Sequence, residues 1–338
     1  MHLVLPAGSG DPRSPSGGDH YDRRVRDALD RTVVETPVAG AWPDPDGADR
    51  DRFDAALARV PAGAPVLLDG LVACAAPDVL ARHAGRLHLV VLVHLPLGDE
   101  LGPGPGLAAD RTARERAALH HAATVVTTSV WTARRVVAVH GLPAYRVHVA
   151  RPGADPAAVT TPVPAGTRLL AVGALTPTKG HDLLVDALAA VADLGWTLHL
   201  TGPADRDPGH AALVRARVGR HGLGDRVTLT GPLTGPDLDA AYAAADLLVL
   251  PSRAETYGMV ATEALARAVP VLAHDVGGVA EAVDGGGLLV APGGLAAALR
   301  AWLTDPALRA DLRAAARARR ARLDGWTVTA RTLAAVLP

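Results

Sequence analysis

Short apolar runs that alternate with longer helical stretches are the feature that most limits how this 338-residue chain can fold. The runs are rich in valine and leucine and too short for helices, so each is predicted to be a buried strand. Near-continuous apolar strands separated by helices indicate parallel sheets that are covered on both faces. The expected strands form two series, at 2–6, 66–69, 88–93, 124–128 and 146–149, and then at 168–173, 197–201, 226–230, 246–250, 270–273 and 288–291.

The two series meet at a proline-rich segment, TTPVPAG, at 160–166. A chain of this length can bury two separate cores, so we predict an α/β protein with two Rossmann-like domains. The predicted boundaries are 1–158 for the first domain and 159–320 for the second, with a C-terminal tail at 321–338 that packs back on the first domain. Two last helical stretches, 306–322 and 327–337, close the chain.

Composition excludes several classes of function. The formal net charge is −1, which gives no reason to expect nucleic acid or an anionic membrane surface as a partner. No apolar run approaches the roughly 20 residues that cross a bilayer, so no stable membrane insertion is expected. The single cysteine, Cys74, rules out an internal disulfide and fits a reducing compartment. A cytoplasmic protein is the expectation, and its oligomeric state stays open.

The stretch from 246 to 283 carries the clearest candidate site. A predicted strand ends at Pro251, a polar loop follows, and Gly258 precedes an alanine-rich helix predicted over 259–268. This order places a helix N-terminus at the carboxyl edge of a parallel sheet, where anionic ligands bind. Glu255 stands in the loop and Glu263 in the helix. Eight residues apart, the two carboxylates could reach a sugar and a ribose, with a diphosphate held between them on the N–H groups of Gly258, Met259 and Val260.

The basic and acidic side chains are unevenly used. Lys179 is the only lysine, and the chain has six glutamates against 29 aspartates. In a chain so poor in lysine and glutamate, these residues are expected where arginine and aspartate will not serve. Lys179 follows the strand that ends at Gly173, and two of the glutamates are Glu255 and Glu263.

Two features of the first domain are candidates for substrate contact. Gly17 and Gly18 follow the loop after the first strand and precede an amphipathic helix, where glycine lets a phosphate or substrate approach the backbone. The sequence around them is not G-x-G-x-x-G, so a nicotinamide dinucleotide is not indicated. His94 stands at the carboxyl end of a buried strand, where it could touch a sugar hydroxyl or a leaving phosphate. The other histidines have no spacing that suggests a metal site.

The segment PSRAETYGMVATEALARAVPVLAHDVGG, which begins at Pro251, resembles the donor-site signature of retaining glycosyltransferases of family 4, the glycosyl transferases group 1. Tyr257 stands where the family usually has phenylalanine. A second segment, GALTPTKG from Gly173, is similar to the family's G-R-L-x-x-x-K-G motif, with Ala174 where the arginine is usual. We hypothesise that Arg253, beside Glu255, supplies the missing charge. The loop with Gly17 and Gly18 also resembles the family's Gly-Gly loop.

The resemblance implies the GT-B fold, in which two Rossmann-like domains with parallel sheets face each other across a cleft. It implies that the first domain binds the acceptor and the second a nucleotide sugar. Glu255 would then bind sugar hydroxyls, Glu263 the ribose, and Lys179 the diphosphate. The implied reaction is transfer of a sugar from an NDP-sugar, UDP- or GDP-linked above all, to a hydroxyl of a small-molecule acceptor, with retention at the anomeric carbon.

Neither a cofactor nor a divalent metal is required by these motifs, because no D-x-D stands at a plausible donor site. Three alternatives share the donor contacts. A nucleotide-sugar epimerase would need no acceptor, and a glycan phosphorylase would need inorganic phosphate. A catalytically silent nucleotide-sugar-binding partner would bind the donor without turnover. Ala174 favours the silent alternative, whereas Glu255, Glu263 and Lys179 favour an enzyme.

Overall fold

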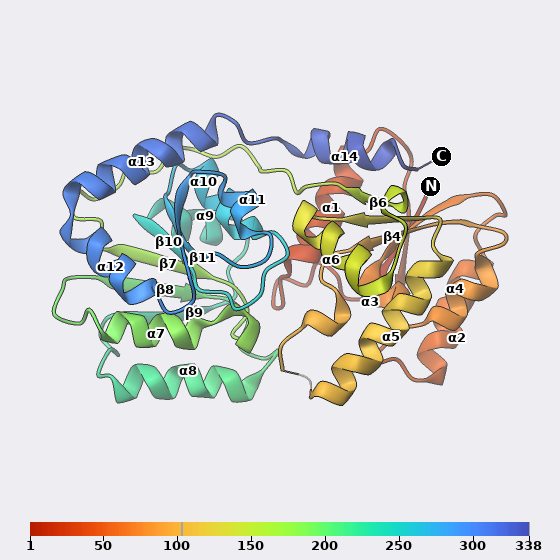
Figure 1. The fold of residues 1–338 in the computed structure, drawn as a ribbon, viewed down its shortest axis with the longest axis horizontal. Coiled ribbons are helices and arrows are strands. Elements are labelled where there is room, and N and C mark those ends of the chain that lie inside the picture. Colours follow the sequence, from red (N-terminus) through yellow and green to blue (C-terminus); the bar gives the residue numbers. More distant parts are fainter. Residues whose placement is uncertain (103, 338) are drawn as a thin grey trace. The chain divides into compact units, whose positions relative to one another are not determined.

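A computed structural model of the chain describes residues 1–102 and 104–337. Contacts divide the chain into two compact units (Figure 1). The first unit comprises Met1–Asp11, Ser16–Gly153 and the segment that begins at Trp326; the second comprises Pro12–Pro15 and Ala154–Gly325. The main division thus falls after Gly153, where the sequence placed it after residue 158. The last residue of the predicted tail, Pro338, lies outside the described residues.

The first unit is built on a six-stranded parallel sheet with the order β2-β1-β3-β4-β5-β6. Its strands are β1 His2–Pro6, β2 Val34–Val38, β3 Pro65–Asp69, β4 His88–Val93, β5 Thr124–Thr127 and β6 Val147–Val149. The chain runs outward from β1 to β2, then returns past β1 to β3 and continues in the opposite direction. The strand order therefore reverses between β1 and β3.

The second unit is built on another six-stranded parallel sheet, with the order β12-β11-β10-β7-β8-β9. Its strands are β7 Arg168–Val172, β8 Thr197–Thr201, β9 Val227–Gly231, β10 Leu247–Leu250, β11 Val271–His274 and β12 Gly287–Val290. Counted from its own first strand, this is the 3-2-1-4-5-6 order of a Rossmann fold read from the other edge. The order reverses between β7 and β10.

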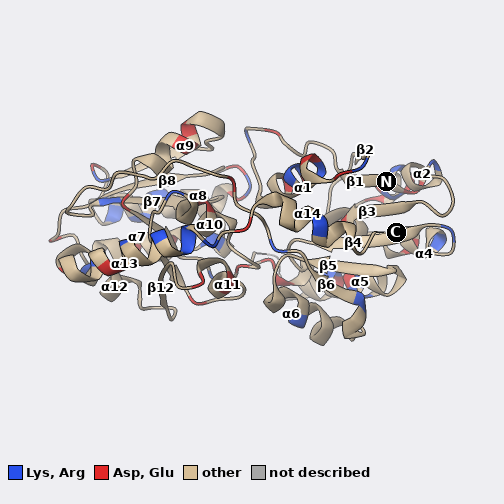
Figure 2. Cartoon of the chain, turned by 90° about the horizontal axis from the view of Figure 1, so that it is seen from above, with Lys and Arg blue, Asp and Glu red and all other residues tan. Residues whose placement is uncertain are grey.

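Helices connect the strands and cover the sheets. Those of the first unit are α1 Gly17–Ala28, α2 Gly47–Ala58, α3 Gly70–Ala73, α4 Pro77–His83, α5 Pro105–His121, α6 Val130–His140 and α14 Trp326–Ala334. Those of the second are α7 His181–Ala189, α8 Pro208–Arg220, α9 Gly235–Ala243, α10 Met259–Ala266, α11 Val279–Val283, α12 Leu295–Thr304 and α13 Pro306–Arg320. Charged residues gather on these helices, whereas the strands are almost entirely without them (Figure 2).

The core of the second unit shows why its strands read as unbroken apolar runs. Leu169 and Ala171 of β7 pack into a cluster on one face of the sheet. Leu170, between them, packs into a second cluster on the other face, which also contains Leu265 of α10. Successive side chains of a strand point to opposite faces, so a sheet covered on both faces needs an apolar residue at every position.

The strands expected from the sequence are present, with ends that differ by about one residue. One strand, β2, was not predicted. Its sequence, VETPV, contains Glu35 and Pro37, and three of its five residues are exposed because it lies at the edge of the sheet. Proline is tolerated on an edge strand, where no ladder hydrogen bond need be donated. The predicted helix over 259–268 ends at Ala266, because Ala268 adopts a left-handed backbone with φ of 56°.

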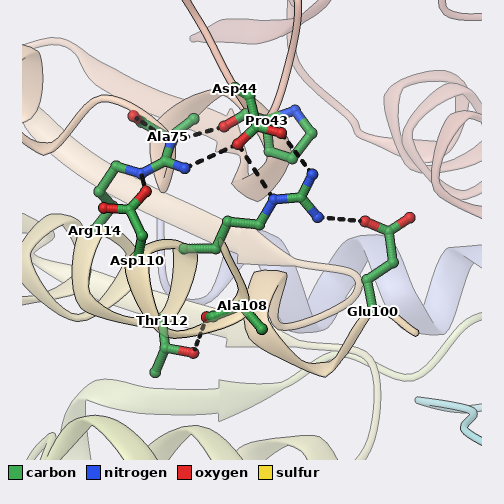
Figure 3. Close-up of polar contacts among 9 residues, drawn as sticks. Pro43, Asp44, Ala75, Glu100, Ala108, Asp110, Thr112 and Arg114 are labelled. Atoms are coloured by element: carbon green, nitrogen blue, oxygen red, sulfur yellow. Dashed lines mark hydrogen bonds and ion pairs between the residues drawn. The ribbon is translucent and has the colours of Figure 1, made fainter. Parts of the chain in front are cut away.

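A network of charged side chains connects the middle of α5 to the loop after β2 (Figure 3). Arg111, which is buried, donates from Nη2 to Asp44 Oδ2 over 2.6 Å and from Nη1 to Glu100 Oε2 over 2.8 Å. Arg114 donates to the other Asp44 oxygen over 2.9 Å and to Asp110 over 2.8 Å. The hydrogen bond from Arg111 lowers the pKa of Asp44 despite its partial burial. The network holds the loop that follows His94.

In the described part of the chain, no helix combines the length and the apolar character needed to span a bilayer.

Candidate functional site

The candidate site of the second unit lies where the strand order reverses. Leu169 and Leu170 of β7 pair with Leu247 and Leu248 of β10, so these strands are neighbours. In open parallel sheets, ligands bind beyond the carboxyl ends of the two strands at such a reversal. Gly173 and Lys179 follow β7, and the loop with Glu255 follows β10. The fold therefore brings together two motifs that are 76 residues apart in sequence.

Lys179 and Glu255 form an ion pair at this point. Lys179 Nζ donates to Glu255 Oε2 over 2.6 Å, and the hydroxyl of Ser252 lies 3.5 Å from the same oxygen. The side chains retain 31% and 11% of their accessible surface. Beneath them, burial and the charge of Lys179 lower the pKa of His181 to about 3, so that its imidazole is neutral. The pair is half-buried and stays within reach of a ligand.

Two glycines let the loops pack closely enough to form this pair. Gly180 has φ of +67°, and a Cβ there would lie 2.2 Å from the carbonyl oxygen of Pro251. Gly277 has φ of +59°, and a Cβ there would lie 1.8 Å from the carbonyl oxygen of Glu255. The amide of Gly278 donates to that same oxygen over 2.9 Å. The turn after β11 thus sets the backbone position of Glu255.

Helix α10 begins one residue after Gly258, which takes a left-handed backbone with φ of 99° and no side-chain cap. An uncapped N-terminus offers its first amide groups and the positive end of the helix dipole to an anion. Met259 and Val260 are half-buried in this first turn. Tyr257 is buried in the core beneath it, with 5% of its surface exposed. A donor contact by Tyr257 would therefore use its backbone, and this contact remains a prediction.

Glu263 lies on the second turn of α10 and is held by a residue that the sequence did not indicate. Tyr242 of α9 donates its phenol hydrogen to Glu263 Oε2 over 2.6 Å. Burial raises the pKa of Glu263, although the Tyr242 hydrogen bond and the nearby Arg267 oppose that rise. Burial also raises the pKa of the Tyr242 phenol well above its ordinary value, so Tyr242 remains the donor.

Arg253 is engaged elsewhere in this structure. Its guanidinium donates to both oxygens of the Asp182 carboxylate, over 2.8 and 2.7 Å, and to the carbonyl oxygen of Pro177 over 2.8 Å. A bidentate pair with a buried carboxylate is among the strongest polar contacts in proteins. The hypothesis that Arg253 replaces the arginine absent at Ala174 stays a prediction, and it would require Arg253 to leave Asp182.

The first unit carries a second cluster, also where a strand order reverses. His94 follows β4, Asp69 ends β3, and Asp22 lies on α1 after β1. His94 Nε2 and Asp22 Oδ1 are 2.9 Å apart, and the ligand atoms of the three residues all lie within 4.8 Å of one another. A Cβ on Gly18 would meet the His94 ring at 3.2 Å, so glycine allows α1 to lie against the imidazole. Gly17 opens the same helix.

The charges of this cluster are strongly coupled. Burial opposes a charge on His94, but the carboxylates of Asp22, Asp69 and Asp19 outweigh it and raise its pKa to about 9. Burial, reinforced by the charge of Asp22, raises the pKa of Asp69 to about 7. At neutral pH, His94 is therefore an imidazolium held by carboxylates. A cation in this position can donate to a sugar hydroxyl or to a phosphate oxygen. The contact of His94, Gly17 or Gly18 with a donor remains a prediction.

The sequence reasoning missed Tyr242, Asp22, Asp69 and Asp182. Tyr242, Asp22 and Asp182 are 21 to 72 residues from their hydrogen-bond partners. Asp69 interacts electrostatically with Asp22 and His94 only because the sheet brings them together. One signal was available for Asp69 and Asp22, because the residues that follow adjacent strands of a parallel sheet meet at one edge. Tyr242 stands in an alanine-rich helix whose sequence gave no such sign.

Comparison with solved structures defines the class of fold. The structure is similar to the sucrose-phosphate synthase of Thermosynechococcus elongatus, with a TM-score of 0.81 and 22% identity over 99% of this chain and 98% of that one. It is also similar to Anabaena HepE in complex with UDP-glucose, with a TM-score of 0.75 and 19% identity over 99% and 98% of the two chains. The two parallel α/β units thus form a GT-B fold, as predicted.

Residues 166–305 match the family described as Glycosyl transferases group 1, so the chain carries a domain of this family in its second unit. The D-inositol 3-phosphate glycosyltransferase of Jonesia denitrificans is 34% identical over 261 residues, which cover 69% of this chain and 61% of that protein. The D-inositol 3-phosphate glycosyltransferase 1 of Catenulispora acidiphila is 33% identical over 287 residues, which cover 77% of this chain and 66% of that protein. The chain therefore spans somewhat less than two thirds of the length of these relatives.

Proposed function

We propose that the protein is a retaining glycosyltransferase that moves a sugar from an NDP-sugar to a hydroxyl group of a small-molecule acceptor. The observation that carries the proposal is the pair of Lys179 and Glu255, 2.6 Å apart at the strand reversal of the second unit. Glu263 lies one helical turn beyond the N-terminus of the adjacent α10. A cation, a helix N-terminus and two carboxylates match the diphosphate, sugar and ribose of such a donor.

The proposed roles follow from the chemistry of each group. Glu255 accepts hydrogen bonds from sugar hydroxyls, and Glu263 accepts them from the ribose. The Lys179 ammonium has three hydrogens, so it can keep Glu255 and still donate to a phosphate oxygen. With the first amides of α10, it stabilises the negative charge that grows on the departing diphosphate. Fixed donors aimed at developing charge are a major source of rate enhancement.

Retention requires the acceptor to attack from the face that the diphosphate leaves. The bond between the anomeric carbon and the phosphate oxygen breaks, and the acceptor oxygen bonds to the same face of that carbon. The acceptor proton passes to the departing phosphate oxygen, which becomes the product diphosphate. No protein nucleophile is needed in this step. His94, charged at neutral pH, would contact a sugar hydroxyl or the leaving phosphate.

The comparisons support this proposal at two points. The relatives are named as glycosyltransferases of D-inositol 3-phosphate, which is a small polyhydroxylated acceptor. The similar HepE structures hold UDP and UDP-glucose, which favours a uridine donor for this chain. We further propose that no divalent metal is needed, because the Lys179 ammonium and the α10 amides provide the positive potential. Addition of EDTA should then leave donor turnover unchanged.

The stereochemistry of turnover tests the proposal. Wild-type protein is incubated with UDP-glucose, GDP-glucose or GDP-mannose and with myo-inositol phosphate as trial acceptor, and the anomeric proton of the first product is followed by NMR. We expect an α-configured product or α-sugar released by slow hydrolysis, since these donors are α-linked. A β-configured first product would contradict retention. Sugar-nucleotide consumption that depends on inorganic phosphate would indicate a phosphorylase instead.

A further inference from the structure

Tyr242 is the side chain from which a further role can be argued. It lies near the end of α9, with 1% of its surface exposed, and packs in the cluster that contains Leu248, Leu250 and Leu265. Its phenol oxygen lies 2.6 Å from Glu263 Oε2 and 3.5 Å from the carbonyl oxygen of Val260. Packing in the core therefore holds the Tyr242 ring in place, and its hydroxyl donates a hydrogen bond to the Glu263 carboxylate.

Arg267 is the charged neighbour that contacts both the Tyr242 ring and the Glu263 backbone. Arg267 lies with its guanidinium carbon 4.7 Å from the centre of the Tyr242 ring. It donates to the backbone oxygen of Glu263 over 2.8 Å and pairs with Asp239. Among the residues that the structure describes, Tyr242 is the only side chain hydrogen-bonded to the Glu263 carboxylate. Arg267 thus packs against the Tyr242 ring and bonds the Glu263 backbone, and the Glu263 carboxylate is left to Tyr242.

We propose that Tyr242 is a positioning residue that orients Glu263 for recognition of the donor's ribose. The inference rests on the proposed function, because it assigns the ribose to Glu263. With Oε2 tied to a rigid phenol, the carboxylate has a single orientation and presents Oε1 to the ligand. Without the phenol, the glutamate rotates among several rotamers and loses the pre-organisation that makes a hydrogen bond to a ribose hydroxyl selective.

Arg267 supports the Tyr242 ring from the turn that follows α10. Arg267 and the left-handed Ala268 occupy the positions that follow the helix. The guanidinium of Arg267 lies over the Tyr242 ring and makes a cation–π contact with it. We therefore include Arg267 as the residue that supports Tyr242.

The test compares ribose with deoxyribose. Calorimetry measures the affinity of wild type, Tyr242→Phe and Glu263→Gln for UDP, GDP and ADP and for their 2′-deoxy and 3′-deoxy forms. Wild type is expected to prefer the ribose form by roughly tenfold or more, the effect of one hydrogen bond to a charged group. Tyr242→Phe should lose most of this preference while it still binds the deoxy forms as wild type does. Tyr145→Phe, which removes an 80% exposed phenol, should retain it.

A double variant separates positioning from folding. If Tyr242 acts through Glu263, Tyr242→Phe should lower ribose preference in wild type but have no further effect in the Glu263→Gln background. Full ribose preference in a folded Tyr242→Phe protein would overturn the inference and leave the proposed function standing. An equal loss of affinity for ribose and deoxyribose forms would also overturn it, as the sign of a purely structural role. Failure of wild type to bind any of the nucleotides would overturn the proposed function, and the inference with it.

Discussion

At the scale of single residues, the Lys179–Glu255 ion pair and the His94 imidazolium have different environments. Lys179 and Glu255 form a half-buried pair that a ligand can reach, with side-chain exposures of 31% and 11%. His94 is enclosed by carboxylates that hold its pKa near 9. The Lys179–Glu255 pair is expected to affect turnover more than stability. His94 is expected to change how the free energy of unfolding depends on pH.

Replacement of Lys179 by alanine, or of Glu255 by glutamine, should lower kcat by about 10²–10³, the usual effect of losing one group that stabilises transition-state charge. The free energy of unfolding should change by no more than about 1 kcal/mol, because partly exposed ion pairs contribute little. Arg300→Ala is the control, since it breaks an exposed pair with Asp193 outside the site. Steady-state kinetics and urea denaturation measure both quantities. Unchanged kcat in either site variant would contradict the assigned roles.

The raised pKa of His94 predicts a particular dependence on pH. A histidine whose folded pKa of about 9 exceeds its unfolded value stabilises the protein fully below about pH 6.5, and that stabilisation disappears as the pH rises through 9. Asp69 has a folded pKa of about 7, above its unfolded value, so its unfolded form ionises first and stability falls with rising pH up to about pH 7. Urea denaturation of wild type and Asp22→Asn from pH 6 to 9.5 should show a steeper fall in wild type, because Asp22 makes the largest favourable contribution to the raised pKa of His94. Parallel profiles would refute the charged His94.

At the scale of secondary-structure elements, the turn after β11 is expected to control Glu255. Gly277→Ala should cost several kcal/mol and abolish donor binding, because its Cβ would lie 1.8 Å from the Glu255 carbonyl oxygen. Gly285→Ala is a matched control: its φ of +79° carries a similar backbone cost, of about 1–2 kcal/mol, but nothing lies within 4 Å of its Cβ. Thermal denaturation and nucleotide binding should separate the two. Equal effects of both substitutions would show that backbone strain alone matters.

Helix α14 offers a second prediction at this scale. Trp326 begins it and packs edge-to-face against the buried Tyr21 of α1, with ring centres 5.6 Å apart; in Figure 1 the two helices lie side by side. Trp326→Ala should cost about 3–5 kcal/mol through the cavity it leaves. Trp326→Phe should cost much less, because the buried indole N–H has no hydrogen-bond partner among the described residues. Denaturant unfolding of the full chain measures both, and similar losses would contradict this packing role.

At the scale of the whole molecule, the sequence was enough to predict two parallel sheets but not all of their strands or contacts. Strands such as β4, buried on both faces, are visible as continuous apolar runs. β2 could not be recognised, because an edge strand with glutamate and proline has no apolar pattern. The loops with Lys179 and Glu255 were predictable because each follows a clear strand. Their 2.6 Å contact was not, since it depends on β7 and β10 being neighbours.

The partners of the site residues were beyond sequence reasoning for the same reason. Arg253 was assigned to a ligand from its place beside Glu255, yet it reaches Asp182, 71 residues away. Asp22 lies 72 residues from His94, and Tyr242 lies 21 residues from Glu263 on a different helix. These contacts arise from tertiary packing, and their geometry decides which charged groups remain available to a donor.

The most direct test of the central claim is binding of UDP-, GDP-, ADP- and dTDP-sugars to wild type, Glu255→Ala and Lys179→Ala, measured by thermal shift and calorimetry, with Arg300→Ala as control. The account predicts that one nucleotide class stabilises wild type and the control, and that both site variants lose most of this affinity. It would be contradicted if no nucleotide sugar bound wild type, or if the two site variants bound the donor as tightly as the control.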